Sequence, residues 1–387
     1  MIYFNNAATS SYKPPYVMRA LIDGSNNNIN LLRSGGHSSV ISAVAVNNSR
    51  NSVANLFNCN NHNVIFTNGC TMALNLAIFG IANLPLKLPF HIISTVMEHN
   101  SVLRPLYELQ RLGAQLTFLS PDDSGSVPIE MLKLAITKET KLIVAVHCSN
   151  VTGGTNDINA FADIANNNNI PFIADIAQSA GYFPVNLNNI DMAALPAHKG
   201  LCGIGGNGAL IMNKNITLKP FVYGGTGVMS HIEEMPDFSP ERYEAGTQNI
   251  GGILALGAAA NWTKENMSKM QYNRNYLQKY ITENLQKMKA IRLISVPNSC
   301  GIVSFVINQN GFDSMLLSSN LSDKFDIITR GGLHCAPLIH KHLNTFETGA
   351  LRISASGSNT IHEADALIYA IDKLCNNDAN INNYTYL

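Results

Sequence analysis

Charged side chains are scarce in this sequence. They make up 13% of the 387 residues, and 26 basic residues balance 26 acidic ones. A chain without net charge has no general electrostatic attraction to nucleic acid or to an anionic membrane surface, so neither is an expected partner. No run of about 18 apolar residues occurs, although a membrane-spanning helix needs one. The start, M-I-Y-F-N-N-A-A-T, lacks the basic and apolar segments of a secretion signal. These absences predict a cytoplasmic protein.

Paired cysteine motifs are also missing. The seven cysteines are an odd number with irregular spacing, and no C-x-x-C occurs. In a chain of this length the pattern predicts reduced thiols rather than a disulfide framework. The group of His334, Cys335, His340 and His342 fits no common metal-ligand spacing. We therefore expect no bound metal.

Apolar residues, in contrast, are abundant at 46%, and they are arranged in a regular alternation. Short strand-like runs alternate with amphipathic helical stretches. The runs lie at 63–67, 91–95, 115–119, 141–146, 171–175, 191–195 and 209–213. This βαβ rhythm predicts an α/β fold, with a mostly parallel seven-stranded sheet that is covered by helices on both faces.

The rhythm changes after about residue 256. A long helix is expected over 254–289, followed by strands at 302–307 and 351–355. This pattern predicts a smaller α+β domain in the C-terminal part. We expect a large domain over 15–255 and a small domain formed by 1–14 and 256–387.

Ligands of open α/β sheets bind outside the carboxyl ends of the strands, so the residues that follow each strand are the candidates. Cys70 and Thr71 follow the first strand at a predicted helix N-terminus, which favours a phosphate group; an ordinary helix cap is the alternative. His99 follows the second strand, where it can stack on a flat ring or transfer a proton; the alternative is a hydrogen-bonded surface histidine. Asn150 follows the fourth strand and can contact a ligand oxygen, unless it is an ordinary loop residue.

Two further strand ends carry ionisable residues. Asp175 ends an apolar strand, where burial is costly unless a cation such as a protonated pyridine nitrogen is its partner; the alternative is a helix N-cap. Gln178 follows and can donate to a neighbouring ring hydroxyl. Lys199 follows the strand at 191–195, and a partly desolvated lysine can form a Schiff base; a surface lysine is the alternative.

None of these signals is specific alone, but their co-occurrence along one sheet edge is. Together they supply a phosphate site, a ring-stacking group, a partner for a pyridinium nitrogen and an imine-forming lysine. Pyridoxal 5′-phosphate (PLP) needs each of these. The residues are Thr71, His99, Asp175, Gln178, His198 and Lys199.

One motif points elsewhere. Residues 203–208, G-I-G-G-N-G, match the glycine pattern of dinucleotide-binding folds. That pattern must follow a strand and open a helix, whereas here it follows the lysine loop and precedes a strand. We therefore expect no dinucleotide site, and we interpret the glycines as a tight turn near the cofactor.

Eight segments carry a family resemblance over nearly the whole chain. The sequence resembles the class V aminotransferase-like, fold-type I PLP enzymes, and within them the cysteine desulfurase and selenocysteine lyase group of the Suf type. The segments are Y-F-N-N-A-A-T-S (3–10), M-E-H-N-S (97–101), S-N-V-T-G (149–153), D-I-A-Q-S-A-G (175–181), A-H-K-G (197–200), Y-E-A-G-T-Q-N (243–249), R-G-G-L-H-C-A-P (330–337) and A-L-R-I-S (350–354).

The resemblance implies a role for each matching residue. Lys199 matches the lysine that attaches PLP, and Cys335 matches the nucleophile that accepts sulfur. His99 matches the ring-stacking histidine, which also serves in proton transfer. The other cofactor contacts implied are Cys70, Thr71, Asp175, Gln178, His198 and, from the second subunit of a homodimer, Thr247. The substrate contacts expected are Asn150, Arg330, Arg352 and His37.

Three positions depart from the family pattern. Pro196 stands where related proteins often have a hydroxyl before the histidine–lysine pair, and Met72 stands where a carboxylate is frequent. The segment L-R-S-G-G-H (32–37) is longer by one residue than its usual counterpart, which leaves the roles of Arg33 and His37 open. We expect PLP binding to persist despite these changes.

The resulting hypothesis is a PLP-dependent desulfurase that converts L-cysteine to L-alanine and leaves a persulfide on Cys335. Arg330 and His334 are neighbouring cations in the sequence that would favour its thiolate, the nucleophilic form. Alternatives are a selenocysteine lyase, another class V lyase that does not need Cys335, a non-catalytic scaffold or sulfur-relay partner, and a merely buried Cys335. The sulfur would pass to a protein acceptor, for example in iron–sulfur cluster assembly.

Overall fold

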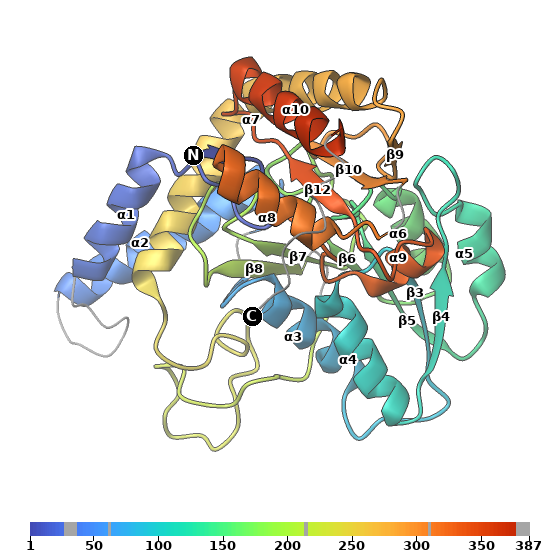
Figure 1. Cartoon of the computed structure of the whole chain (residues 1–387). Helices are drawn as coiled ribbons and strands as arrows, with labels where there is room; N and C mark the ends of the chain where they lie inside the picture. Colours follow the sequence, from blue (N-terminus) through green and yellow to red (C-terminus); the bar gives the residue numbers. More distant parts are fainter. Residues whose placement is uncertain (27–36, 61–62, 213–215, 309–310, 377–387) are drawn as a thin grey trace, which may run out of the picture.

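A seven-stranded sheet forms the centre of the computed structural model, which describes residues 1–26, 37–60, 63–212, 216–308 and 311–376 (Figure 1). The strand order is β2-β8-β7-β6-β5-β3-β4, and only β8 runs antiparallel to its neighbours. Every predicted strand of this sheet is confirmed to within one residue at each end. The strands are β2 (Val64–Thr67), β3 (His91–Thr95), β4 (Gln115–Leu119), β5 (Thr140–Val146), β6 (Phe172–Asp175), β7 (Met192–Pro196) and β8 (Gly208–Met212).

The sheet is buried on both faces because successive side chains of a strand point to opposite sides. In β3, Ile92 packs into the core beneath α3 (Cys70–Ala82) and α4 (Asn100–Arg111). Ile93 points the other way, into the core shared with α6 (Ile158–Asn167) and α7 (Ile250–Leu285). Both cores are apolar throughout, which explains why the strands read as continuous apolar runs rather than as alternating ones.

A three-stranded antiparallel sheet in the order β12-β10-β9 forms the C-terminal part. Its strands are β9 (Ile291–Leu293), β10 (Ile302–Ile307) and β12 (Leu351–Ser354). The remaining helices are α1 (Pro15–Asn26), α2 (His37–Leu56), α5 (Ile129–Ala135), α8 (Ser314–Phe325), α9 (Pro337–His342) and α10 (Ile361–Asn376). None of the helices within the described ranges is both long and apolar enough to cross a membrane.

Helix α7 begins four residues earlier than the predicted 254, since the Asn249 side chain caps it by accepting a hydrogen bond from Gly252 N. It also continues without interruption across the boundary at 255 that we predicted between the two domains. The division into domains of 15–255 and of 1–14 with 256–387 stays a prediction.

The N-terminal segment lies within the C-terminal part of the fold (Figure 1). Strand β1 (Ile2–Tyr3) pairs in parallel with β11 (Ile327–Ile328). Ser354 N, at the end of β12, donates to Phe4 O at 2.7 Å. After this pairing, residues 5–8 continue to the carboxyl edge of the central sheet, where the candidate site lies.

One pair of cysteines departs from the expected pattern. The sulfurs of Cys148, after β5, and Cys300, before β10, lie in contact, but their Cα atoms are 7.7 Å apart, whereas disulfides usually have Cα atoms about 4.4–6.8 Å apart. The other five cysteines are free thiols, as expected: Cys59, Cys70, Cys202, Cys335 and Cys375. A pairing across 152 residues leaves no trace in the spacing of cysteines along the chain.

Candidate active site

A cavity of about 310 Å³ opens at the carboxyl ends of the parallel strands. The ends of β3, β5, β6 and β7 each deliver one or more polar residues to it, because these strands all run in the same direction. The structure thereby brings most of the predicted site residues together. Those that line the cavity are Cys70, Thr71, His99, Asn150, Asp175, Gln178, His198, Lys199, Arg330 and Arg352.

Three further residues singled out from the sequence either line another pocket or fall outside the described residues. Thr247 is exposed and lines a separate pocket beside Phe66 and Met72. The side chain of His37 and the whole of Arg33 fall outside the described residues. Pro196, in place of the hydroxyl residue common in related proteins, lines the cavity directly.

Asp175 and Lys199 form the electrostatic centre of the cavity. The Asp175 side chain is buried, and its Oδ1 accepts hydrogen bonds from Ala177 N at 2.9 Å and from Cys70 Sγ at 3.6 Å. Burial raises the pKa of Asp175, although Lys199 and the two donors oppose this rise. Burial lowers the pKa of Lys199, against the opposing attraction of Asp175. A cationic ring nitrogen beside Asp175 would replace the solvation that its carboxylate has lost.

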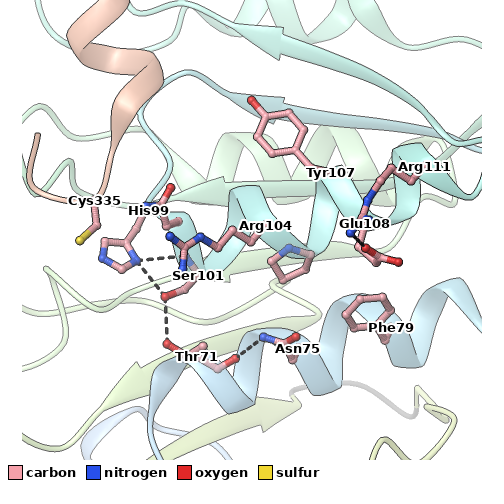
Figure 2. Close-up of a pocket in the computed structure, with 12 residues that line it drawn as sticks. Thr71, Asn75, Phe79, His99, Ser101, Arg104, Tyr107, Glu108, Arg111 and Cys335 are labelled. Atoms are coloured by element: carbon pink, nitrogen blue, oxygen red, sulfur yellow. Dashed lines mark hydrogen bonds and ion pairs between the residues drawn. The ribbon is translucent and has the colours of Figure 1, made fainter. Parts of the chain in front are cut away.

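His99 stands at the N-terminus of α4, on the wall opposite α3. Its Nδ1 accepts from Ser101 N at 3.1 Å and contacts Ser101 Oγ at 2.8 Å, and that hydroxyl in turn contacts Thr71 Oγ1 at 2.9 Å (Figure 2). Burial, followed by the charge of Lys199, lowers the pKa of His99 to about 4. The imidazole is therefore neutral near pH 7, and because Nδ1 is an acceptor, the ring proton resides on Nε2.

Two guanidinium groups make part of the cavity wall cationic. Arg352 is buried; its Nη1 donates to Asn150 O at 3.0 Å and its Nη2 to Asn5 Oδ1 at 3.1 Å, whereas its Nε has no partner in the described part of the chain. Burial, with the charge of Arg330, lowers the pKa of Arg352 to about 9. No acidic side chain of the described residues pairs with either arginine, so both can receive an anionic group.

Cys335 lies at the mouth of the site, in an outer groove of about 750 Å³ that shares Thr71, His99 and Ser101 with the inner cavity (Figure 2). Arg330 Nη2 donates to the Cys335 sulfur at 3.4 Å. His334 and Cys335 both have left-handed backbones, with φ of 50° and 59°, which cost about 1–2 kcal/mol each for residues other than glycine. Such strain persists only where the surroundings impose it, and it is typical of functional loops.

The prediction that His334 is a cation beside Cys335 is wrong. Its side chain is 1% exposed, its Nε2 is hydrogen-bonded to Ala350 O at 3.0 Å, and its ring lies against the His340 ring. Burial and the nearby arginines lower the pKa of His334 well below its usual value, so the ring is neutral. The positive φ turns the side chain inward, which a sequence cannot reveal.

Sequence reasoning missed Glu98, although it is part of the M-E-H-N-S segment. The side chain is fully buried, and its Oε1 accepts from Thr95 Oγ1 at 2.7 Å and from Val146 N at 2.8 Å. Burial raises the pKa of Glu98 to about 8, so near pH 7 the carboxyl is mostly protonated. It ties the end of β3 to the end of β5 and thereby fixes the backbone next to His99. Ala7 and Ala8 of the N-terminal segment, also missed, line the cavity.

Buried histidines predict a specific response to acid. Burial lowers the pKa values of His147 and His340 to about 4, whereas both titrate near 6.5 in an unfolded chain. Between these values the unfolded state binds more protons, so the free energy of unfolding falls with decreasing pH, by up to about 1.4 kcal/mol per pH unit for each histidine. Urea unfolding at pH 7, 6 and 5 measures this. We expect His340→Gln to flatten the dependence and the exposed control His342→Gln to leave it unchanged; equal slopes in all three proteins would contradict the assignment.

The residues present fit PLP, as the cavity itself indicates. It offers a buried carboxylate for the ring nitrogen, a lysine held near it, the N-terminus of α3 for the phosphate and a buried Gln178 Oε1 that lacks a partner among the described residues. A fold with a mostly parallel seven-stranded sheet and this set of groups defines a fold-type I, PLP-dependent enzyme.

The comparisons with known proteins agree with this class. The class-V aminotransferase family model matches residues 2–367, and the chain belongs to that family. A cysteine desulfurase of Haloferax volcanii is 30% identical over 96% of this chain and 89% of the relative. A probable cysteine desulfurase of Methanothermobacter thermautotrophicus is 29% identical over 95% of this chain and 94% of the relative.

A solved structure shows the same similarity in three dimensions. The apo structure of a cysteine desulfurase from Thermococcus onnurineus superposes with a TM-score of 0.87 at 29% identity, covering 97% of this chain and 94% of that one. The resemblance stated from the eight sequence segments, the fold class and the PLP cofactor are thereby confirmed.

Proposed function

We propose that this protein is a PLP-dependent cysteine desulfurase, which converts L-cysteine to L-alanine and keeps the sulfur as a persulfide on Cys335. The observation that carries the proposal is the place of Cys335: a thiol in contact with Arg330, at the mouth of a cavity that holds Lys199 and Arg352. The two relatives described above align over 94% and 89% of their own length. Their names, probable cysteine desulfurase and cysteine desulfurase, support the proposal.

Several residues would hold the cofactor. Asp175 would pair with the ring nitrogen, His99 would stack on the ring, and Thr71 and His198 would contact the phosphate. Gln178 Nε2 donates one hydrogen bond to Ala7 O at 2.9 Å, and Gln178 Oε1 has no partner among the described residues, so the amide would hydrogen-bond to the ring hydroxyl. Cys70 would act through its contact with Asp175. When bound, PLP supplies an electron sink that weakens the bonds at the substrate Cα and Cβ.

The chain's own residues would orient the substrate and move its protons. The Arg352 guanidinium would bind the carboxylate of cysteine in the two-pronged geometry that a lysine cannot reproduce, with Arg330 adding positive charge. Because burial lowers its pKa, Lys199 can release its own proton and accept the Cα proton of the substrate. The neutral His99, with its proton on Nε2, can donate to the substrate and be reprotonated from solvent.

The sulfur transfer itself would be made by Cys335. Its thiolate attacks the substrate sulfur, forming a sulfur–sulfur bond as the carbon–sulfur bond breaks. The bonding electrons stay with the three-carbon fragment, which takes up protons and leaves as alanine, and no external oxidant is needed. Arg330, which donates to the Cys335 sulfur, would hold it in place for this attack.

The groove outside Cys335 would receive the sulfur acceptor, which we propose to be a protein thiol. The groove has a volume of about 750 Å³, and Arg104, Tyr107 and Phe79 line it (Figure 2). We also propose a homodimer. Thr247 is exposed and does not line its own chain's cavity, which is compatible with a contact to the cofactor phosphate of a second subunit.

Alanine formation by the purified protein, with L-cysteine and L-selenocysteine compared side by side, tests the proposed function. We expect alanine from L-cysteine and a sulfur on Cys335 that mass spectrometry detects as an added 32 Da, the mass of one sulfur atom, on a peptide spanning about residues 330–342. Turnover of L-selenocysteine alone would support a selenocysteine lyase in its place.

Arg352→Lys tests the substrate carboxylate site. We expect kcat/KM for L-cysteine to fall roughly 10–100-fold, mainly through KM, because one of the two parallel hydrogen bonds is lost. Steady-state kinetics measure this, and Arg292→Lys, an exposed position on β9, is the matched control. An unchanged KM would place the carboxylate elsewhere.

A further inference from the structure

Asn150 connects the cavity to the backbone of the nucleophile loop. Its Nδ2 donates to the carbonyl oxygen of His334 at 2.7 Å, directly before Cys335. The other end of the same amide, Oδ1, is buried and has no partner among the described residues. Asn150 is 6% exposed, so water does not readily replace the hydrogen bond to His334.

The two left-handed residues of the loop are held through their carbonyl groups. While the His334 carbonyl accepts from Asn150, the Cys335 carbonyl accepts from Asn100 N, at the start of α4, at 2.7 Å. At Gly331, which precedes this turn, an added Cβ would collide with the Ser314 carbonyl oxygen, so the loop has no room to shift toward α8. Asn150 is thus the side chain that holds the His334 carbonyl group in this strained turn.

The hydrogen bond between Asn150 and His334 is connected to the residues that would bind the substrate carboxylate. Arg352 Nη1 donates to the Asn150 backbone oxygen at 3.0 Å, and Arg352 and Arg330 exchange backbone hydrogen bonds at 2.8 and 3.2 Å. Arg330 in turn contacts the Cys335 sulfur. Asn150 therefore lies between the group that would bind the substrate carboxylate and the loop that carries the nucleophile.

We propose that Asn150 is a positioning residue for Cys335: its amide holds the left-handed His334–Cys335 turn in the conformation that points the sulfur at the substrate. This role rests on the proposed desulfurase function, but it differs from the carboxylate contact expected for Asn150 from the sequence. A contact with the substrate carboxylate has an effect only when substrate is bound. The hydrogen bond from Asn150 to the His334 carbonyl, in contrast, holds the loop in the resting enzyme as well.

The test uses the PLP-loaded protein and two variants. Asn150→Asp keeps the size of the side chain but puts an oxygen where the amide nitrogen donates to His334; Asn150→Ala removes the side chain altogether. In both, we expect persulfide formation on Cys335 in a single turnover to slow about 10–100-fold, since a displacement near 1 Å has an effect of that size. Binding of L-cysteine, followed by the absorbance of the cofactor, should weaken much less.

Hydrogen–deuterium exchange without substrate separates the two roles. When the loop is released from Asn150, the backbone amides of 331–336 and the Asn100 amide should exchange faster than in the wild type, while the melting temperature and the exchange of β5 and β6 remain the same. Asn168→Ala, an exposed amide bonded to Ile164 O, is the control and should change nothing. Unchanged exchange of the loop, or a loss confined to substrate affinity, would overturn the positioning role. Absence of any persulfide in the wild type would instead refute the desulfurase function.

Discussion

Replacing Lys199 by alanine is expected to abolish the covalent attachment of PLP and to reduce alanine formation by at least about 10³-fold. The side chain would serve twice, as the attachment point and as the base for the Cα proton, and no other lysine of the described residues lines the cavity. Burial lowers the pKa of Lys199, which favours the uncharged amine that both roles require.

Absorbance and mass spectrometry measure this loss directly. In the wild type, borohydride reduction should fix the cofactor on the peptide that contains Lys199; in Lys199→Ala no peptide should carry it. Lys219→Ala is the control, an exposed lysine whose Nζ donates to Leu84 O. If Lys199→Ala still carries reducible cofactor on another lysine, the assignment of the attachment point is wrong.

Replacing Cys335 by alanine is expected to lower desulfuration of L-cysteine at least about 100-fold, because a thiol from solution must then replace one that is held beside the substrate. Cofactor binding and the melting temperature should stay near wild-type values, since the side chain lies in the outer groove and not in a core. The Cys335→Ala variant would thus separate the sulfur-accepting step from everything that precedes it.

Persulfide mapping and sulfide release measure the effect, and Cys375→Ala, a free cysteine on α10, is the matched control. Turnover of L-selenocysteine by Cys335→Ala at the wild-type rate would be compatible with the assignment, because selenium leaves more readily. Turnover of L-cysteine by Cys335→Ala at the wild-type rate would contradict the assignment, and a lyase mechanism without a persulfide would then be the better explanation.

The sequence predicted the central sheet closely because its strands are buried on both faces, so the apolar runs begin and end where the strands do. Helix α7 was predicted less well. Its first turn reads I-G-G-I, which lacks a helical pattern, and the Asn249 cap that starts it was not recognised.

The sequence predicted the location of those site residues that closely follow the end of a strand. Asp175, Lys199 and His99 could be grouped because parallel strands deliver their last residues to one edge. Three other features could not be predicted, because each depends on a loop conformation or on a distance through space. They are the contact between Arg330 and the Cys335 sulfur, the inward turn of His334 and the pairing of Cys148 with Cys300.

The pairing of β1 with β11, and of Phe4 with Ser354, has a consequence for the protein as it is made. Residues 2–4 are synthesised before their partners, which follow about 320–350 residues later; at 5–20 residues per second this delay is roughly 15–70 seconds. Throughout that time the cavity lacks Arg330, Arg352 and the loop that carries Cys335. We therefore expect an incomplete chain to lack the proposed sulfur-accepting site, which forms only after these distant segments have paired.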